Sequence, residues 1–232
     1  DRSVVSSGLP ELDTMLGGGL DRGTSLIIVG PSGAGKSTLG TQFACAAAAR
    51  GERCAYYLFD ETERAFRARA ETLRMPLRDD DAEPGHVEVR QIDPAEFSPG
   101  EFAHDVRSTV ENGARLVVID SINGYLTGMP DESHLPMHLH ELLTYLALRN
   151  VVTILTLNQH GLVSSDPQSP VEVSYLADST LLIRYFEAAG AVRRAASLLK
   201  RRFGAHEVLI REMKIHPPGV HLGQPLREFR GV

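Results

Sequence analysis

Cysteine is scarce in this sequence, and it contains no long apolar run. The two cysteines, Cys45 and Cys54, show no repeated spacing, which excludes a disulfide-stapled scaffold and favours a reducing compartment. No segment approaches the roughly 18 consecutive apolar residues of a membrane span. Residues 1–3 also lack the basic and apolar segments of a signal peptide. We therefore expect a cytoplasmic protein without a membrane partner.

Positive charge is also in short supply. Lysine and arginine together number 24 against 30 acidic residues, and the formal net charge at pH 7 is -6. Proteins that bind nucleic acid non-specifically usually carry a basic excess, so nucleic acid is not the expected partner. Only three of the 24 basic residues are lysines, at positions 36, 200 and 214. Because the sequence uses arginine everywhere else, each lysine is a candidate for a specific function.

Short apolar segments alternate with longer segments of helical periodicity along most of the chain. The expected strands are 25–29, 54–59, 87–92, 116–119 and 151–157, and the expected helices are 37–50, 63–74, 102–112 and 135–149. Three more strands, 179–186, 191–199 and 207–215, follow with turns at Gly190 and Gly204. This order predicts one α/β domain over residues 1–232, with a mostly parallel central sheet, helices on both faces and an antiparallel C-terminal extension. Ligands in such sheets bind at the carboxyl ends of the strands.

The strongest motif is a phosphate-binding loop between the first of these strands and the helix after it. It matches G-x-x-x-x-G-K-[ST], in which the glycines let backbone N–H groups approach an anion closely. Lys36 is expected to reach the terminal phosphates, and the Ser37 hydroxyl is expected to bind Mg²⁺. The sequence thus predicts ATP and Mg²⁺ as ligands. The predicted nucleotide-binding residues here are Gly30, Pro31, Ser32, Gly33, Ala34, Gly35, Lys36, Ser37 and Thr38.

Acidic residues follow two other predicted strands. Asp120 ends an apolar strand, where a carboxylate can hold Mg²⁺ through water. Asp60 and Glu61 end another, and hydrolysis needs a group there that orients or deprotonates the attacking water. We predict Glu61 in that role, with Asp60 as its neighbour and stand-in and Lys36 as the third catalytic group. The alternative is that Asp60 or Thr62 simply caps the helix that follows.

Two further polar segments can meet a phosphate. Thr156 or Asn158, at the exit of a buried strand, can sense the terminal phosphate, and the sequence does not decide between them. Residues 200–202 are three adjacent cations, which repel one another unless an anion is near. They can either reach a neighbouring subunit's phosphate or blunt the edge of a hairpin with charge.

Taken in this order, the motifs resemble the KaiC-like ATPases of the RecA superfamily. The resemblance covers nearly all 232 residues. It implies a RecA-like P-loop NTPase fold and a homo-oligomeric ring, commonly a hexamer, with ATP between the subunits. The matching segments are 7–13, 17–20, 59–61, 118–121, 182–187, 200–204 with His206, and 210–212.

The resemblance also implies roles for particular residues. Lys200 and Arg202 match the basic pair that reaches the neighbour's terminal phosphate, and His206 matches a residue near the nucleotide. Asp60 replaces the usual glutamate of the catalytic pair, so Glu61 is expected to carry the base role.

Two departures from the family pattern concern regulation and length. Ser174 and Tyr175 stand where a Ser-Thr pair is autophosphorylated, so a two-site phosphorylation cycle is not expected and an autokinase activity at Ser174 is left open. The family often carries two such domains in one chain. We therefore expect this chain to be a fragment of a longer protein.

These observations favour slow Mg²⁺-dependent ATP hydrolysis at the subunit interfaces of a regulatory ring whose partner proteins the sequence does not name. One alternative is a DNA motor, but segments 122–136 and 161–175 lack lysine and arginine and contain acidic residues. The other is a module that holds ATP in order to assemble and barely turns it over. His134, His138 and His140 share one predicted helix, but we do not expect a metal site there.

Overall fold

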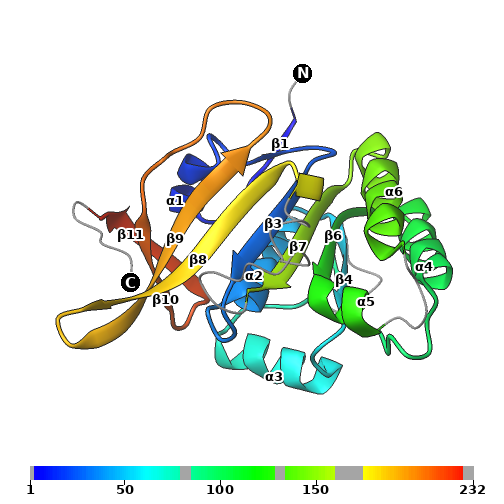
Figure 1. Cartoon of the computed structure of the whole chain (residues 1–232), viewed down its shortest axis with the longest axis horizontal. Coiled ribbons are helices and arrows are strands. Elements are labelled where there is room, and N and C mark those ends of the chain that lie inside the picture. The colour runs from blue at the N-terminus through cyan, green and yellow to red at the C-terminus, as the bar shows by residue number, and fades with distance from the viewer. Residues whose placement is uncertain (1–2, 79–84, 129–133, 160–174, 227–232) are drawn as a thin grey trace.

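A nine-stranded mixed sheet forms the centre of the computed structural model, which describes residues 3–78, 85–128, 134–159 and 175–226. The strand order is β11-β10-β9-β8-β3-β7-β6-β4-β5 (Figure 1). From β8 to β5 neighbouring strands are parallel, and from β8 to β11 they are antiparallel. The strands are β3 (Ser25–Gly30), β4 (Arg53–Leu58), β5 (Val87–Gln91), β6 (Ala114–Asp120), β7 (Val152–Asn158), β8 (Ser179–Ala188), β9 (Ala191–Arg201), β10 (Arg211–Ile215) and β11 (Val220–Pro225). A separate pair, β1 (Val4–Val5) and β2 (Leu20–Asp21), lies outside this sheet.

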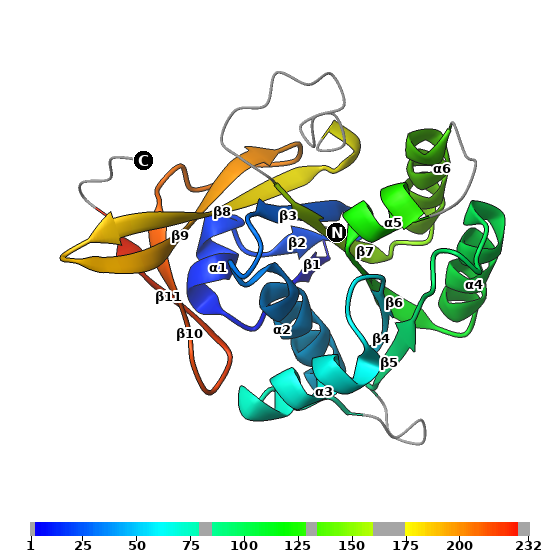
Figure 2. The same cartoon turned by 60° about the horizontal axis from the view of Figure 1, so that its bottom comes forward.

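Helices cover both faces of the parallel part of the sheet. The helices α1 (Pro10–Met15), α2 (Lys36–Ala49) and α3 (Glu63–Thr72) lie on one side, and α4 (Pro99–Glu111), α5 (Ile122–Gly128) and α6 (Leu135–Leu148) lie on the other (Figures 1 and 2). Successive strand side chains point to opposite faces, so one strand supplies both cores. In β3, Leu26 and Ile28 join the first core while Ile27 and Val29 join the second. This double burial explains why the central strands read as unbroken apolar runs.

The predicted fold class is confirmed, with differences at element ends. Helix α4 begins at Pro99 rather than 102, because Ser98 and Glu101 form a reciprocal capping box that starts it earlier. The strand expected over 207–215 begins only at Arg211. Residues 207–210 do not join the strand, because Glu207 has other partners. Its amide donates to the carbonyl of Met15 (3.1 Å), and its carboxylate forms an ion pair with Arg211.

Several elements were not predicted. They include α1, α5, β1, β2 and β11, each of seven residues or fewer, which is too short to show a clear period. The phosphorylation position Ser174 lies outside the described residues. Within the described part of the chain, no helix has the length and apolar character needed to cross a bilayer.

Candidate nucleotide-binding site

The carboxyl ends of four parallel strands bring the predicted motifs to one edge of the sheet. The phosphate loop follows β3, the paired carboxylates follow β4, Asp120 ends β6 and Asn158 ends β7. Their side chains line a common hollow of about 440 Å³. Segments up to 128 positions apart in sequence thus meet because the strands are parallel and in register. Its lining includes Ser32, Gly33, Gly35, Lys36, Ser37, Thr38, Asp60, Glu61, Asp120 and Asn158.

The phosphate loop has the backbone that its glycines allow. Gly33 and Gly35 have φ angles of 74° and 104°, in the left-handed region that disfavours other residues. A Cβ on Gly35 would lie 2.4 Å from Cδ1 of Ile215, because the β10–β11 hairpin packs against the loop. Gly35 also caps α2 without any side-chain hydrogen bond. The first amides of α2 therefore lack intrahelical acceptors, and the helix end forms a site for an anion.

Lys36 is a buried cation beside this loop. Lys36 is only 6% exposed, and its Nζ donates to the Pro31 carbonyl at 2.7 Å. Burial lowers its pKa to about 8, and the nearby Asp120 carboxylate opposes this shift. A phosphate in the hollow would supply the countercharge that the buried ammonium needs.

Asp120 is held by hydrogen bonds from two strands. The Tyr56 hydroxyl lies 2.9 Å from Oδ2 and also lies 3.2 Å from the Ser37 carbonyl, while Thr156 Oγ1 donates to Oδ1 at 2.5 Å. Burial first, and then the Asp120 charge, raises the pKa of Tyr56 well above its usual value, so the hydroxyl stays a donor. Tyr56 thereby ties Asp120 to the first turn of α2.

The oxygen donors at this point fit a magnesium ion. Ser37 and Asp120 offer a hydroxyl and a carboxylate on the wall of one hollow, and Mg²⁺ prefers few protein oxygens plus phosphate and water. No group of three or more His, Cys, Asp or Glu in the described ranges is placed to hold a metal on its own. Ser37 and Asp120 are thus suited to a metal ion whose remaining ligands come from a bound nucleotide and water.

The paired carboxylates have separate partners. The Ser121 hydroxyl donates to Asp60, and Arg69 forms an ion pair with Glu61. Thr62, rather than Asp60, caps α3 by accepting a hydrogen bond from the helix. Neither carboxylate is therefore taken up by the capping role that the sequence left open for Asp60. Of the two residues left open as phosphate sensors, Asn158 lines the hollow, whereas Thr156 is fully buried against Asp120.

The predicted basic pair does not join this hollow. Lys200 Nζ donates to the Ala177 carbonyl at 2.7 Å, and Arg202 pairs with Asp178 at 3.2 Å. Asp178 accepts from the amide of Ser25, which starts β3, so this cluster lies at the amino end of the strand whose other end carries the phosphate loop. Burial first, and then Arg202, lowers the pKa of Lys200.

His206 also lies away from the hollow. Its neighbours in the chain contact the end of α1: the Glu207 amide donates to Met15, and a Cβ on Gly17 would lie 2.3 Å from the Ala205 carbonyl. Within a single chain, the hollow at the phosphate loop is lined neither by Lys200 and Arg202, expected to reach a neighbour's nucleotide, nor by His206, expected to lie near the nucleotide.

Two residues of the β8–β9 hairpin contact the phosphate loop and were not predicted from the sequence. The Tyr185 hydroxyl lies 3.4 Å from the Ser32 carbonyl, and Arg194 Nη2 lies 3.4 Å from the Gly33 carbonyl. The Arg194 guanidinium also lies 5.7 Å from the centre of the Tyr185 ring. These contacts depend on the position of the β8–β9 hairpin beside the phosphate loop. No local sequence pattern predicts that position.

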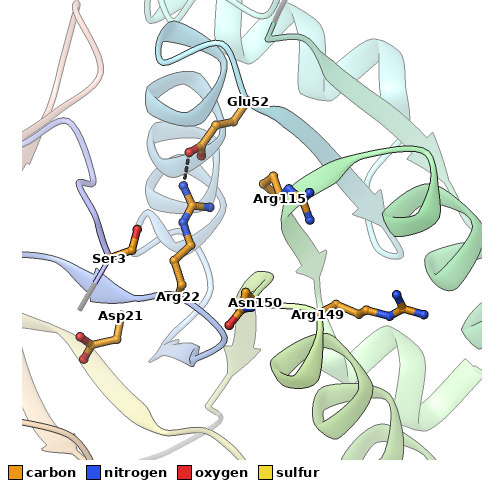
Figure 3. A pocket seen from close by; sticks show the side chains of 7 residues that line it. All are labelled: Ser3, Asp21, Arg22, Glu52, Arg115, Arg149 and Asn150. Carbon is orange, nitrogen blue, oxygen red and sulfur yellow. Dashed lines mark hydrogen bonds and ion pairs between the residues drawn. The ribbon is translucent and has the colours of Figure 1, made fainter. Parts of the chain in front are cut away.

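A larger cavity, of about 670 Å³, lies at the amino ends of the parallel strands. Figure 3 shows the side chains that line it. Its carboxylates are already paired: Glu52 with Arg22 and Arg50, and Asp21 with Arg201. It contains neither the glycine-rich loop nor the start of a long helix. Both of these features belong to the smaller hollow instead. The larger cavity is lined by Ser3, Asp21, Arg22, Glu52, Arg115, Arg149 and Asn150.

Comparisons with known proteins place the chain in a family. The family model of the KaiC ATPase matches residues 5–227. The chain belongs to the KaiC ATPase family. Circadian clock protein KaiC3 of Synechocystis sp. is 26% identical, over 98% of this chain and 45% of its own length. KaiC2 of the same organism is 30% identical, over 94% and 39%, and the DNA repair protein RadA of Brucella abortus is 31% identical, over 88% and 42%. The chain thus spans less than half the length of these relatives.

Proposed function

We propose that this chain binds Mg-ATP at the carboxyl edge of its sheet and hydrolyses it slowly. The observation that carries the proposal is the meeting of the phosphate loop, Asp120 and Glu61 around one hollow. The KaiC family membership supports ATP as the nucleotide. The relatives named as circadian clock proteins support a regulatory role in which partner proteins read the nucleotide state.

Each part of the hollow has a task in this proposal. The free amides of α2 and the ammonium of Lys36 hold the phosphates. Ser37 and Asp120 hold Mg²⁺, which neutralises charge on the phosphates when it is bound. Glu61 orients or deprotonates the attacking water, and Asn158 contacts the terminal phosphate. Lys36 also stabilises the charge that develops in the transition state.

We further propose that the active site is completed by a second copy of the chain. Lys200 and Arg202 lie at the opposite edge from the phosphate loop, so they can reach a nucleotide only on a neighbouring copy. Repeating such a head-to-tail contact closes a ring. The same segment exposes Leu199, Phe203 and Val208 at 58%, 47% and 79%, which supports a protein contact there.

The decisive experiment measures size by light scattering with and without Mg-ATP, with phosphate release followed on the same sample. The expected result is an assembly of several copies that forms with ATP and releases phosphate slowly. A chain that binds ATP but stays monomeric would refute the role of Lys200 and Arg202 in a neighbour's site. A ring that forms without phosphate release above background would instead indicate a module that holds ATP only for assembly.

Mixing two inactive variants tests the shared site directly. Lys36→Ala removes nucleotide binding from one copy, and Arg202→Ala removes the basic group offered to a neighbour. In a mixed ring, random assembly rebuilds roughly a quarter of the interfaces with both parts intact. Activity should therefore return on mixing. If no activity returns although mixed rings form, Arg202 does not act on a neighbour's nucleotide.

The likeness to RadA keeps a DNA-dependent motor as a second candidate. Such a motor would bind DNA with an affinity that falls as salt rises. A net charge of -6 and the absence of lysine and arginine from 122–136 and 161–175 disfavour it. DNA-stimulated phosphate release would favour it over the regulatory ring.

A further inference from the structure

Arg69 contacts Glu61 from the helix that follows it. Helix α3 starts at Glu63, and Thr62 caps it. Arg69 lies in the second turn, and helical side chains tilt toward the amino end of their helix. Its guanidinium therefore reaches back over the first turn to the loop that carries Glu61. There Nη1 donates to both carboxylate oxygens, at 2.6 and 2.5 Å.

The guanidinium is held on a second side by an aromatic ring. It lies 5.4 Å from the ring centre of Phe66, one turn earlier, and Phe66 is fully buried in the core. The side chains of Arg69 and Glu61 are 29% and 27% exposed, so solvent only partly screens their attraction. Nη2 of Arg69 is buried and has no hydrogen-bond partner in the described part of the chain. The ring and the carboxylate thus set the position of the guanidinium.

The charges around the hollow explain why a cation is needed here. Three carboxylates, Asp60, Glu61 and Asp120, line it together with two cations, Lys36 and Arg69. Lys36 is directed to the phosphate loop, where its Nζ bonds to a backbone carbonyl. Asp60 is held by a hydroxyl. Glu61 follows Asp60 directly, and Arg69 is the cation that offsets the repulsion between these adjacent charges.

We propose that Arg69 is the positioning residue for Glu61, a role that rests on the proposed ATP hydrolysis. A glutamate side chain has several rotamers, and only some direct its oxygens toward an attacking water. Nη1 of Arg69 holds one of these rotamers, because this nitrogen donates to both carboxylate oxygens and rotation of the carboxylate would break at least one of the two bonds. The competing explanation is a purely structural ion pair, in which Arg69 holds α3 against the preceding loop and has no effect on the orientation of Glu61 during hydrolysis.

A double-mutant cycle on ATP hydrolysis separates these explanations. Steady-state kcat and KM are measured for the full chain, Arg69→Ala, Glu61→Gln and the double variant. Misplacing a catalytic group by about 1 Å can cost a hundred-fold in rate, so Arg69→Ala should lower kcat roughly ten- to hundred-fold. The KM for ATP should change little. In the Glu61→Gln background, Arg69→Ala should have almost no further effect, since the carboxylate it positions is gone.

The same helix offers a matched control. Arg67 forms an ion pair with Glu63 at the helix surface, with side chains 36% and 41% exposed, and neither residue lines the hollow. Arg67→Ala removes an arginine and an ion pair from α3 and should leave kcat unchanged. Arg69→Lys keeps the charge without the planar fork, and its kcat should lie between those of the unchanged chain and Arg69→Ala.

Several outcomes would overturn the positioning role. If Arg69→Ala lowers kcat by the same factor in the unaltered chain and in Glu61→Gln, the ion pair is purely structural. The same conclusion follows if Arg67→Ala lowers kcat as much as Arg69→Ala does. An unchanged kcat in Arg69→Ala and in Arg69→Lys would reject the proposal and leave the proposed hydrolysis standing. If the unaltered chain shows no Mg²⁺-dependent hydrolysis, the proposed function fails and the positioning role fails with it.

Discussion

The buried ammonium of Lys36 makes nucleotide affinity depend on pH in a predictable direction. In the free protein its pKa is lowered from 10.5 to about 8, chiefly by burial. A bound phosphate stabilises the charged form, so the pKa of Lys36 in the complex must be higher. Between these two values, binding takes up a proton. Affinity is therefore full below pH 8 and falls as pH rises through 8.

The size of the effect follows from the fraction of protein that carries the proton. At pH 9 roughly one-tenth of the free molecules hold a charged Lys36, against about nine-tenths at pH 7. The Kd of a non-hydrolysable ATP analogue with Mg²⁺ should rise roughly ten-fold over that interval. The terminal phosphate titrates near pH 6 and so stays ionised across this range.

Calorimetry measures both quantities in one experiment. Titrations in buffers of different ionisation enthalpy give the number of protons taken up, which should approach one at pH 9. Lys36→Arg is the matched control, because a guanidinium keeps its charge throughout this range and any remaining affinity should not vary with pH. A Kd that is flat from pH 7 to 9 in the unaltered chain, or a release of protons, would refute the reasoning.

Binding is a better measurement here than unfolding. Burial raises the pKa values of Cys45, to about 11, and of Cys54. As pH rises through 9 the unfolded chain loses these thiol protons while the folded chain keeps them, so stability falls. The lowered pKa of Lys36 acts in the opposite direction, since above pH 8 the unfolded chain holds the extra proton. The two contributions offset each other in an unfolding curve.

Three further substitutions test the loop, the metal site and the core. Gly35→Ala forces a Cβ to 2.4 Å from Ile215 at a φ of 104°, so thermal unfolding should show a loss of about 1–3 kcal/mol, and nucleotide binding should be lost with it. Asp120→Asn keeps the shape of the side chain but removes its charge, so a magnesium titration of phosphate release should need roughly ten-fold or more Mg²⁺ for half-maximal activity. Phe102→Ala empties a fully buried site between three aromatic rings and should cost about 3–5 kcal/mol in denaturant unfolding.

Each of these has a control within the chain. Gly18 also has a positive φ, of 112°, but no atom lies within 4 Å of its Cβ position, so Gly18→Ala should cost less than Gly35→Ala. Equal losses of stability in the two variants would mean that the Ile215 side chain moves aside at little cost. An Asp120→Asn variant with unchanged magnesium dependence would remove Asp120 from the metal site. Leu148 is 80% exposed, so Leu148→Ala should change stability by less than about 0.5 kcal/mol, and a similar small change in Phe102→Ala would contradict the packing argument.

Local patterns in the sequence were sufficient to predict the loop and the order of most elements. The motif from Gly30 to Ser37 works through backbone conformation and a helix start, which neighbouring residues decide. The buried strands were visible as apolar runs because helices cover both of their faces. Asp60, Glu61 and Asp120 could be placed at one edge from strand direction alone, since parallel strands end together.

The partners of these residues depended on the tertiary structure. Tyr56 meets Asp120, Arg69 meets Glu61, and Arg194 meets the phosphate loop through contacts across 64, 8 and 161 positions of sequence. The structure also separated Lys200 from its own chain's phosphate loop, because antiparallel β9 carries it back to the amino edge. Strand register and hairpin position decide such contacts, and both are set by the packing of whole elements rather than by any short run of residues.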